Sequence, residues 1–382
     1  MRIAIISDGV HPYVIGGMQR HTFYLCKYLS LSGVKVTLYH FNKSNLDIEK
    51  LEIFSEKERE NIESIVIPFP SSNKLPGHYI RDSYKYSCLI YEQIKDRLNE
   101  FDFIYSKGFS AWKLIEQKKH KKIDCPPIGV KFHGYEMFQK QADFKSFLQS
   151  YLLKGSVRWI SKNADYVFSY GSKITKIIES LGINNNRIIE IPAGIEKEWI
   201  SQVEKPRNKI RKFVYLGRYE RRKGIEELNS VLNELIKQNT DFEFHFIGPF
   251  EKEQQIQSNL IHYHGSITDN SRIRAILDAS DCLVCPSWSE GMPNVILEAM
   301  ARSCAIIASN VGAVSIEVDS SNGLLIEPGD KTQLKNAINR FLSLDEADIL
   351  AMQESSRNKI INKFEYSLII EEVLTKINNT IK

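Results

Sequence analysis

The stretch of sequence that decides the fold is residues 285–301, Cys-Pro-Ser-Trp-Ser-Glu-Gly-Met-Pro-Asn-Val-Ile-Leu-Glu-Ala-Met-Ala. It follows the apolar segment 281–285, which predicts a short buried strand. Pro293 is a residue type favoured at the first position of a helix. The pattern therefore predicts a strand, a tight loop and a helix start, with one carboxylate in the loop, Glu290, and a second in the helix, Glu298.

This arrangement favours a ligand that combines a sugar with a diphosphate. The first turn of a helix offers free backbone N–H groups and the positive end of the helix dipole, which together bind anions. Carboxylates repel phosphate but accept hydrogen bonds from sugar hydroxyls. A diphosphate at the helix start would have Glu290 on one side and Glu298 on the other, which suits a molecule built as sugar, diphosphate and ribose.

The segment Glu-Gly-Met-Pro-Asn-Val-Ile-Leu-Glu, residues 290–298, resembles the signature of glycosyltransferase family 4, a family of retaining enzymes with the GT-B fold. The resemblance implies that Glu290 holds hydroxyls of the donor sugar and that Glu298 holds the nucleotide ribose. It also implies a donor-binding role for the residues around them, Gly291, Met292, Pro293 and Asn294. Either glutamate alone reads more readily as a solvated surface acid, but the surrounding motif disfavours that alternative for the pair.

Length and composition indicate an ordinary soluble protein of two domains. The chain has 382 residues, 42% hydrophobic and 26% charged. It contains no apolar run of the roughly 18–20 residues that span a bilayer, and its beginning reads as a first strand rather than a signal peptide. The six cysteines lack framework spacing, which is typical of a cytoplasmic protein, and Cys282 and Cys285 read as buried thiols rather than a metal pair.

The net charge is +4, and residues 1–200 have an excess of basic residues, with 29 Lys and Arg against 22 Asp and Glu. This asymmetry favours an acidic or phosphate-bearing acceptor, or peripheral contact with an anionic membrane surface at its inner face. The alternative is a lysine-rich face that only promotes solubility. Nothing in the sequence indicates a nucleic-acid partner.

The first residues predict a parallel sheet. A strand over 2–7, a glycine-containing loop, a helix over 18–32 and a strand over 34–41 form a βαβ unit. Gly16 and Gly17 precede the helix, where glycine lets backbone approach a ligand closely. They do not form a Gly-x-Gly-x-x-Gly fingerprint. The resemblance implies that both lie beside the donor diphosphate and the acceptor, and a plain tight turn is the alternative.

A strand over 128–132 runs directly into His133 and Gly134. Most single histidines are structural, but ligands of open α/β sheets bind just beyond the carboxyl ends of the strands. The resemblance implies that His133 reaches the donor sugar near the reacting centre, so His133 and Glu290 are the predicted catalytic residues. Further along, residues 150–164 predict a helix.

The polar segment 196–211 reads as a linker, and a strand over 212–216 opens the second half. That strand runs into Gly-Arg-Tyr-Glu-Arg-Arg-Lys-Gly, residues 217–224. Arginine grips two phosphate oxygens and lysine supplies a point charge. Such clusters are often only solvated surface, but the resemblance assigns Arg218 and Lys223 to the diphosphate and leaves Arg221 and Arg222 as bystanders.

These observations predict an α/β protein of the GT-B type, with two Rossmann-like domains facing a central cleft. Residues 1–200 form the acceptor domain, joined by a C-terminal helix, 365–382, that crosses back to it. Residues 201–364 form the nucleotide-sugar domain. The expected reaction moves a sugar, with retention, from a UDP-sugar or GDP-sugar to a hydroxyl of a glycan or lipid-linked acceptor. The expected pathway is bacterial surface polysaccharide, lipopolysaccharide or glycolipid assembly. No Asp-x-Asp motif stands in a suitable place, so no metal or cofactor is expected.

Two other functions share this fold. A sugar-nucleotide epimerase would hydrolyse or isomerise the donor without an acceptor, and a non-catalytic sugar-nucleotide-binding protein would have a damaged site. A dehydrogenase would need the missing dinucleotide fingerprint.

Overall fold

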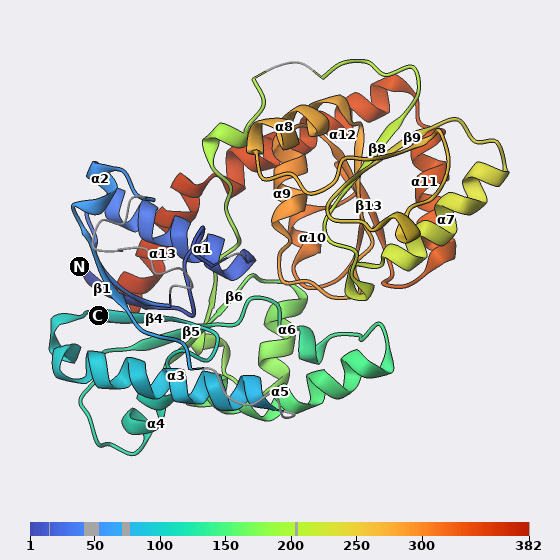
Figure 1. Ribbon diagram of the computed structural model, residues 1–382. Coiled ribbons are helices and arrows are strands. Elements are labelled where there is room, and N and C mark those ends of the chain that lie inside the picture. Colours follow the sequence, from blue (N-terminus) through green and yellow to red (C-terminus); the bar gives the residue numbers. More distant parts are fainter. Residues whose placement is uncertain (15, 42–52, 71–76, 203–204, 382) are drawn as a thin grey trace.

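The computed structural model describes residues 1–14, 16–41, 53–70, 77–202 and 205–381. Within them the chain forms two parallel sheets, each covered by helices on both faces (Figure 1). This confirms the predicted fold class. Neighbouring strands in the sheets are separated in sequence by helices, as parallel pairing requires.

The first sheet has seven strands in the order β3-β2-β1-β4-β5-β6-β7. Their bounds along the chain are β1 (Arg2–Ile6), β2 (Lys35–His40), β3 (Ile62–Val66), β4 (Phe103–Lys107), β5 (Ile128–Lys131), β6 (Tyr166–Ser169) and β7 (Ile188–Glu190). The helices are α1 (Gly17–Leu31), α2 (Glu56–Arg59), α3 (His78–Ile94), α4 (Trp112–Lys119), α5 (Phe144–Asn163) and α6 (Lys173–Ser180). Short 3₁₀ turns are η2 (Lys95–Glu100), η3 (Glu136–Phe138), η4 (Asn185–Arg187) and η5 (Lys197–Trp199).

The second sheet has six strands in the order β10-β9-β8-β11-β12-β13. They are β8 (Lys212–Leu216), β9 (Glu243–Ile247), β10 (Ile261–Tyr263), β11 (Cys282–Cys285), β12 (Ala305–Ser309) and β13 (Gly323–Ile326). The helices are α7 (Ile225–Lys237), α8 (Asn270–Ala279), α9 (Asn294–Ala301), α10 (Val314–Glu317), α11 (Lys331–Leu342), α12 (Glu346–Lys359), the π-helical η8 (Ile360–Phe364) and α13 (Tyr366–Ile381). Two 3₁₀ turns, η6 (Arg221–Lys223) and η7 (Lys252–Gln254), complete this half.

Strand order fixes where each sheet binds ligands. In both sheets the order reverses beside the first strand, between β1 and β4 and between β8 and β11. Open parallel sheets bind ligands at the carboxyl ends of the strands at such a reversal. In the second half this point lies between the loop after β8 and the loop after β11, the two loops that carry the predicted donor residues.

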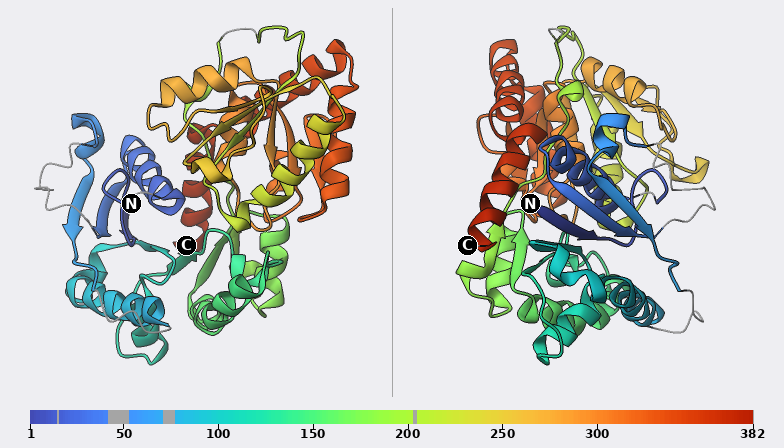
Figure 2. Two further views of the ribbon diagram at one scale, coloured as in Figure 1. Left: turned by 45° about the vertical axis from the view of Figure 1, so that its right-hand side comes forward. Right: turned by 90° about the vertical axis from the view of Figure 1, so that its left-hand side faces the viewer.

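The last helix returns to the first domain, as predicted. α13 packs beside α1, which is clearest in the right-hand view of Figure 2. Tyr366 stacks on Tyr28 with ring centroids 5.0 Å apart. Ile370 and Val373 are buried in the same apolar core as Ile3 of β1. The hydrophobic face of α13 therefore completes the first domain's core.

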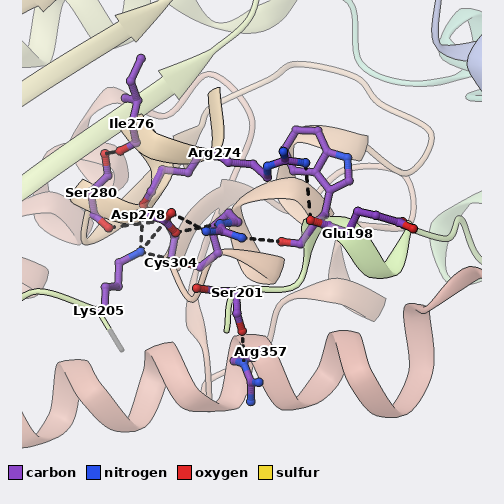
Figure 3. Close-up of polar contacts among 12 residues, drawn as sticks. Glu198, Ser201, Lys205, Arg274, Ile276, Asp278, Ser280, Cys304 and Arg357 are labelled. Atoms are coloured by element: carbon purple, nitrogen blue, oxygen red, sulfur yellow. Dashed lines mark hydrogen bonds and ion pairs between the residues drawn. The ribbon is translucent and has the colours of Figure 1, made fainter. Parts of the chain in front are cut away.

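The predicted linker is held against the second domain rather than hanging free (Figure 3). Lys205 donates to the carbonyl oxygens of Leu277, at 3.0 Å, and Arg302, at 2.7 Å. Arg302 also donates to Trp199 O at 3.2 Å, and Arg357 donates to Ser201 O at 3.0 Å. Residues 203 and 204 of the linker lie outside the described residues.

The helix predicted over 150–164 begins six residues earlier, at Phe144. Asp143 provides the reason, because its side chain accepts a hydrogen bond from Ser146 N at 2.7 Å and caps the helix. The buried-thiol reading of Cys282 and Cys285 is confirmed, since both are buried and free. No helix among the described residues combines the length and the apolar character needed to cross a membrane.

Replacing Ile370 by alanine tests the contribution of α13 to the first domain. The side chain is 4% exposed, so its truncation leaves a cavity and is expected to cost about 2–5 kcal/mol of unfolding free energy. Denaturant unfolding measures this. Leu368→Ala, on the same helix but 39% exposed, is the matched control and should change stability by less than about 0.5 kcal/mol. Equal effects of the two variants would contradict the packing described.

Candidate active site

Two loops of the second domain pack against each other where β8 and β11 end. The backbone N–H of Trp288 donates to Arg222 O at 2.8 Å. Gly224 has φ +70°, and a Cβ there would lie 2.0 Å from Pro286 O. This left-handed glycine in close contact lets the loop that carries the basic residues lie against the loop that carries Glu290.

Glu290 is buried and held by two cations of the neighbouring loop. Lys223 Nζ donates to its Oε1 at 2.6 Å, and Arg222 Nη1 lies 3.5 Å from its Oε2. Burial opposes ionisation of this carboxyl, but Lys223 and Arg222 outweigh it and hold the pKa of Glu290 below its ordinary value. Glu290 is therefore an ionised hydrogen-bond acceptor beside a cluster of positive charge.

The basic loop places its arginines differently from the expectation. Arg222, predicted to be a bystander, lies at Glu290. The side chain of Arg218 is 72% exposed and pairs with Glu220 at 3.0 Å, so this structure does not bring it to Glu290. Arg221 pairs with Glu227 at 2.8 Å, away from the carboxylate. The phosphate-binding role of Arg218 stays a prediction.

Glu298 is bound across the two domains. Its side chain is buried on α9, and Arg20 of α1 donates to its Oε1 at 2.9 Å. Burial raises the pKa of Glu298, and Arg20 partly offsets that rise. The cavity beside this pair is about 10 Å³, roughly the space of one water. This space is too small for a sugar, and the role of Glu298 in holding a ribose stays a prediction.

The loop of Glu290 also touches the first domain directly. A Cβ on Gly291 would lie 2.0 Å from His133 O, so only glycine fits this contact. Gln139 Nε2 lies between the loops and donates to both Gly134 O and Glu290 O at 2.6 Å. Met292 Sδ, on the other side, accepts from Ala193 N at 3.0 Å. The predicted catalytic residues therefore meet at one interface.

His133 is oriented by Tyr170. The Tyr170 hydroxyl lies 2.8 Å from Nδ1, while Nε2 is shielded from solvent without a hydrogen-bond partner. Burial, reinforced by Lys107 and Lys131, lowers the pKa of His133 well below its ordinary value. The imidazole is therefore neutral at neutral pH, with Nε2 left without a hydrogen-bond partner, and its contact with a donor sugar stays a prediction.

The two glycines predicted to precede the first helix lie at its start, because Gly16 is the N-cap of α1 and Gly17 is its first residue. A Cβ on Gly16 would lie 2.2 Å from Gln19 Oε1, whereas a Cβ on Gly17 would meet nothing within 4 Å. Gln19 in turn donates to Asp8 at 2.9 Å. A side chain at Gly16 would displace the Gln19 amide, and Gly17 leaves open space at the start of the helix that carries Arg20. Their contact with a diphosphate stays a prediction.

The helix after Glu290 begins one residue later than expected. Pro293 is the N-cap of α9, and Asn294 is its first residue. Its unpaired N–H groups therefore start at the interface, between Glu290 and Glu298, where an anion can bind.

A buried acid that the motif reading did not include lies near Glu290. Glu317 closes α10 and is 0% exposed, and neither of its carboxylate oxygens has a hydrogen-bond partner. Burial, with the charge of Glu290, raises the pKa of Glu317 well above its ordinary value. Burial therefore favours the protonated form of this carboxyl in the folded protein. Gln139, Tyr170 and Arg20 also escaped the motif reading, because their roles depend on contacts between distant segments.

Among the described residues, one group of three candidate metal ligands comes together. Glu243 and His245 of β9 lie with His262 of β10, their ligand atoms within 4.8 Å of one another. Glu243 also pairs with Lys212 at 3.1 Å. The group begins at the amino end of β9, whereas Glu290 follows the carboxyl end of β11, so it is separate from the candidate site.

The comparisons with known proteins agree with this geometry. The family described as Glycosyltransferase Family 4 matches residues 15–199, and the one described as Glycosyl transferases group 1 matches residues 210–344. The chain belongs to the family 4 glycosyltransferases. The family expected from the motif at 290–298 is thereby confirmed.

This family 4 chain is similar to several known proteins. It is 32% identical over 161 residues to the putative teichuronic acid biosynthesis glycosyltransferase TuaC of Bacillus subtilis, covering 40% of each chain. It is 28% identical over 178 residues to the capsular polysaccharide biosynthesis glycosyltransferase CapM of Staphylococcus aureus, covering 44% of this chain and 46% of that one. The matches span less than half the length of these relatives. Sucrose-phosphate synthase from Thermosynechococcus elongatus shares the fold, with a TM-score of 0.76 at 19% identity, covering 99% of this chain and 98% of the other.

Gly291→Ala tests the contact between the domains of this glycosyltransferase. The new Cβ would meet the backbone of His133, so we expect the domains to separate locally at a cost of about 1–3 kcal/mol. Small-angle scattering should show a larger radius of gyration than for the wild type. Gly155→Ala, where a Cβ would meet nothing within 4 Å, is the control. An unchanged radius for Gly291→Ala would contradict the contact.

Glu317→Gln tests the buried acid. Because the folded pKa lies above the ordinary value of 4.5, the folded state binds more protons than the unfolded state as pH rises past that value. Wild-type stability therefore falls with rising pH, by up to about 1.4 kcal/mol per pH unit until the folded pKa is reached. Thermal unfolding measured from about pH 4.5 upwards should show that the stability of Glu317→Gln rises relative to that of the wild type as pH rises. The exposed Glu354→Gln should show no such gain.

Proposed function

We propose that the chain transfers a sugar from a UDP-sugar or GDP-sugar to a hydroxyl of a glycan or lipid-linked acceptor, with retention of anomeric configuration. The observation that carries the proposal is the position of Glu290. It is ionised, held by Lys223 at 2.6 Å, and its neighbour Gly291 lies against the carbonyl of His133. A sugar bound there contacts both domains, with cations within reach of its phosphate.

The donor would replace contacts that the site makes with itself. The diphosphate would draw Lys223 and Arg222 towards its oxygens, together with the free N–H groups at the start of α9. Glu290, released from Lys223, would accept hydrogen bonds from sugar hydroxyls. Glu298, released from Arg20, would accept from the ribose. Because these groups already supply positive charge for the leaving diphosphate, we propose that the reaction needs no metal.

In the proposed reaction the acceptor hydroxyl attacks the anomeric carbon from the face that the diphosphate leaves. The bond from that carbon to the phosphate oxygen breaks as the new glycosidic bond forms, and the hydroxyl proton passes to the departing phosphate. Neutral His133 is suited to this step because it can hydrogen-bond the sugar without placing a second positive charge beside the developing one. Closure of the domains would exclude water from the site.

The names of TuaC and CapM place those proteins in teichuronic acid and capsular polysaccharide biosynthesis. We propose a corresponding role for this chain in bacterial surface polysaccharide or glycolipid assembly, at the inner face of the membrane.

Binding of UDP-, GDP- and ADP-sugars in the presence of EDTA tests the donor site. We expect one nucleotide class to raise the melting temperature of the wild type. We expect Glu298→Ala to bind that donor at least about tenfold more weakly, the loss of roughly one hydrogen bond to a charged group. Glu253→Ala, an exposed acid of the same domain, is the control. Binding that requires a divalent metal, or no binding, would contradict the proposal. Isomerised donor formed without an acceptor would indicate an epimerase instead.

A further inference from the structure

The first half of α5 presents an apolar stripe to solvent. Its large hydrophobic residues recur at i, i+3, i+4, i+7 and i+8, the spacing that normally turns one helix face to a protein core. Here they are exposed: Phe144 78%, Phe147 47%, Leu148 57%, Tyr151 66% and Leu152 49%. We call these five residues the α5 stripe.

The stripe is not a consequence of a poorly packed helix. In the second half of α5, Val157 and Ile160 are 0% exposed and belong to the main core. Other exposed large hydrophobics among the described residues are scattered, as is normal for a soluble surface. Five within nine consecutive residues form a patch of the kind that marks an interaction site. Figure 1 shows α5 along the lower edge of the molecule, on the same side as α3 and α4.

The charges around the stripe are positive. α5 contains Lys145, Lys154, Arg158 and Lys162 and no acidic residue, and Asp143 beside it is engaged in capping the helix. Lys154 Nζ lies 5.7 Å from the ring centre of Phe147, and Lys119 of α4 lies 5.3 Å from that of Trp159. Aromatic and aliphatic residues flanked by lysine and arginine are the composition of helices that lie in the interface of an anionic bilayer.

The stripe begins beside the candidate active site. Gln139, which donates to Glu290 O at 2.6 Å, stands five residues before Phe144. Lys140 donates to Pro328 O at 3.0 Å and lies 5.0 Å from the ring centre of Trp288, so it also spans the two domains. A surface that holds the first turns of α5 therefore lies near the entrance between the two domains.

We propose that the α5 stripe docks this protein on an anionic lipid bilayer, with its apolar side chains in the headgroup region and its lysines against the lipid charges. The idea that this bilayer presents a lipid-linked acceptor rests on the proposed function, whereas the docking itself does not. A second copy of the chain is a poorer occupant. A symmetric contact pairs each patch with itself, and stripe on stripe would bring Lys145 and Lys154 of both copies together without an acid on α5 to neutralise them.

Vesicle flotation tests the docking. Wild-type protein should bind vesicles that contain phosphatidylglycerol, bind weakly to pure phosphatidylcholine, and be released by salt. The triple variant Phe147→Ser, Leu148→Ser and Tyr151→Ser should bind at least about tenfold more weakly, because the apolar area that enters the bilayer is lost. A matched triple variant at exposed leucines elsewhere, Leu31→Ser, Leu89→Ser and Leu368→Ser, should bind like the wild type.

A charge reversal separates the electrostatic part. Lys145→Glu should weaken binding to anionic vesicles by about fivefold or more, because each basic residue near a charged membrane surface strengthens binding by about that factor. Lys252→Glu, an exposed position of the second domain, should not. Equal vesicle binding by the wild type and the stripe variant would overturn the proposal. A second outcome would also overturn it: the wild type forms a dimer in solution and does not bind vesicles, and the stripe variant is monomeric.

Nucleotide-sugar binding by the same variants keeps this proposal distinct from the proposed function. The stripe variant should retain the donor-induced rise in melting temperature, since none of its three positions contacts Glu290 or Glu298. Vesicle binding without donor binding would leave the docking standing and overturn the proposed function. Donor binding without stripe-dependent vesicle binding would overturn the docking and leave the proposed function standing.

Discussion

The structure depends on a contact in which the backbone of one domain meets the backbone of the other. Gly291 fits against the carbonyl of His133 because it has no side chain, and Gln139 ties the adjacent carbonyl of Glu290 to the same loop. Sheet topology brings each loop to its place, since both follow strands whose carboxyl ends face the interface. One glycine therefore decides how far apart the predicted catalytic residues stand.

Charge at the interface is balanced within the protein, and this shapes what a ligand must do. Buried carboxylates are costly unless they are paired, and each of the two motif glutamates has a cation at hydrogen-bonding distance. Glu290 takes its partner from the adjacent loop, but Glu298 takes Arg20 from the other domain. A nucleotide bound at Glu298 would thus compete with a contact that holds the domains together. If a nucleotide binds at Glu298 as proposed, its entry would have to break this ion pair between the domains.

The pattern of apolar and polar residues in the sequence predicted those strands and helices whose formation depends on neighbouring residues. The strands at Lys212–Leu216 and Cys282–Cys285 lie where the sequence predicted them, because a buried parallel strand is largely apolar. The Arg20–Glu298 pair joins residues 278 positions apart, and no local pattern reports it. The contact of Arg222 with Glu290 was not predicted for a similar reason. The short turn η6 at Arg221–Lys223 decides which of several basic side chains faces Glu290, and residue type alone does not. The motif thus identified the site, while its partners required the fold.

The chain passes between the domains twice, and the two passages lie together. Ile195 N donates to Phe364 O, and Tyr366 N donates to Ile195 O, so the crossing segments pair at a single point. Beyond it, Ser201 and Lys205 bind the second domain while α13 packs into the first. Rotation of the domains about this point would have to break the contacts that Arg20, Gln139 and Gly291 make between them. Fixing the first domain through α5 would then leave the second free to open for the donor and to close again over Glu290. In that proposed arrangement the first domain would position the acceptor, and movement of the second domain would admit the donor.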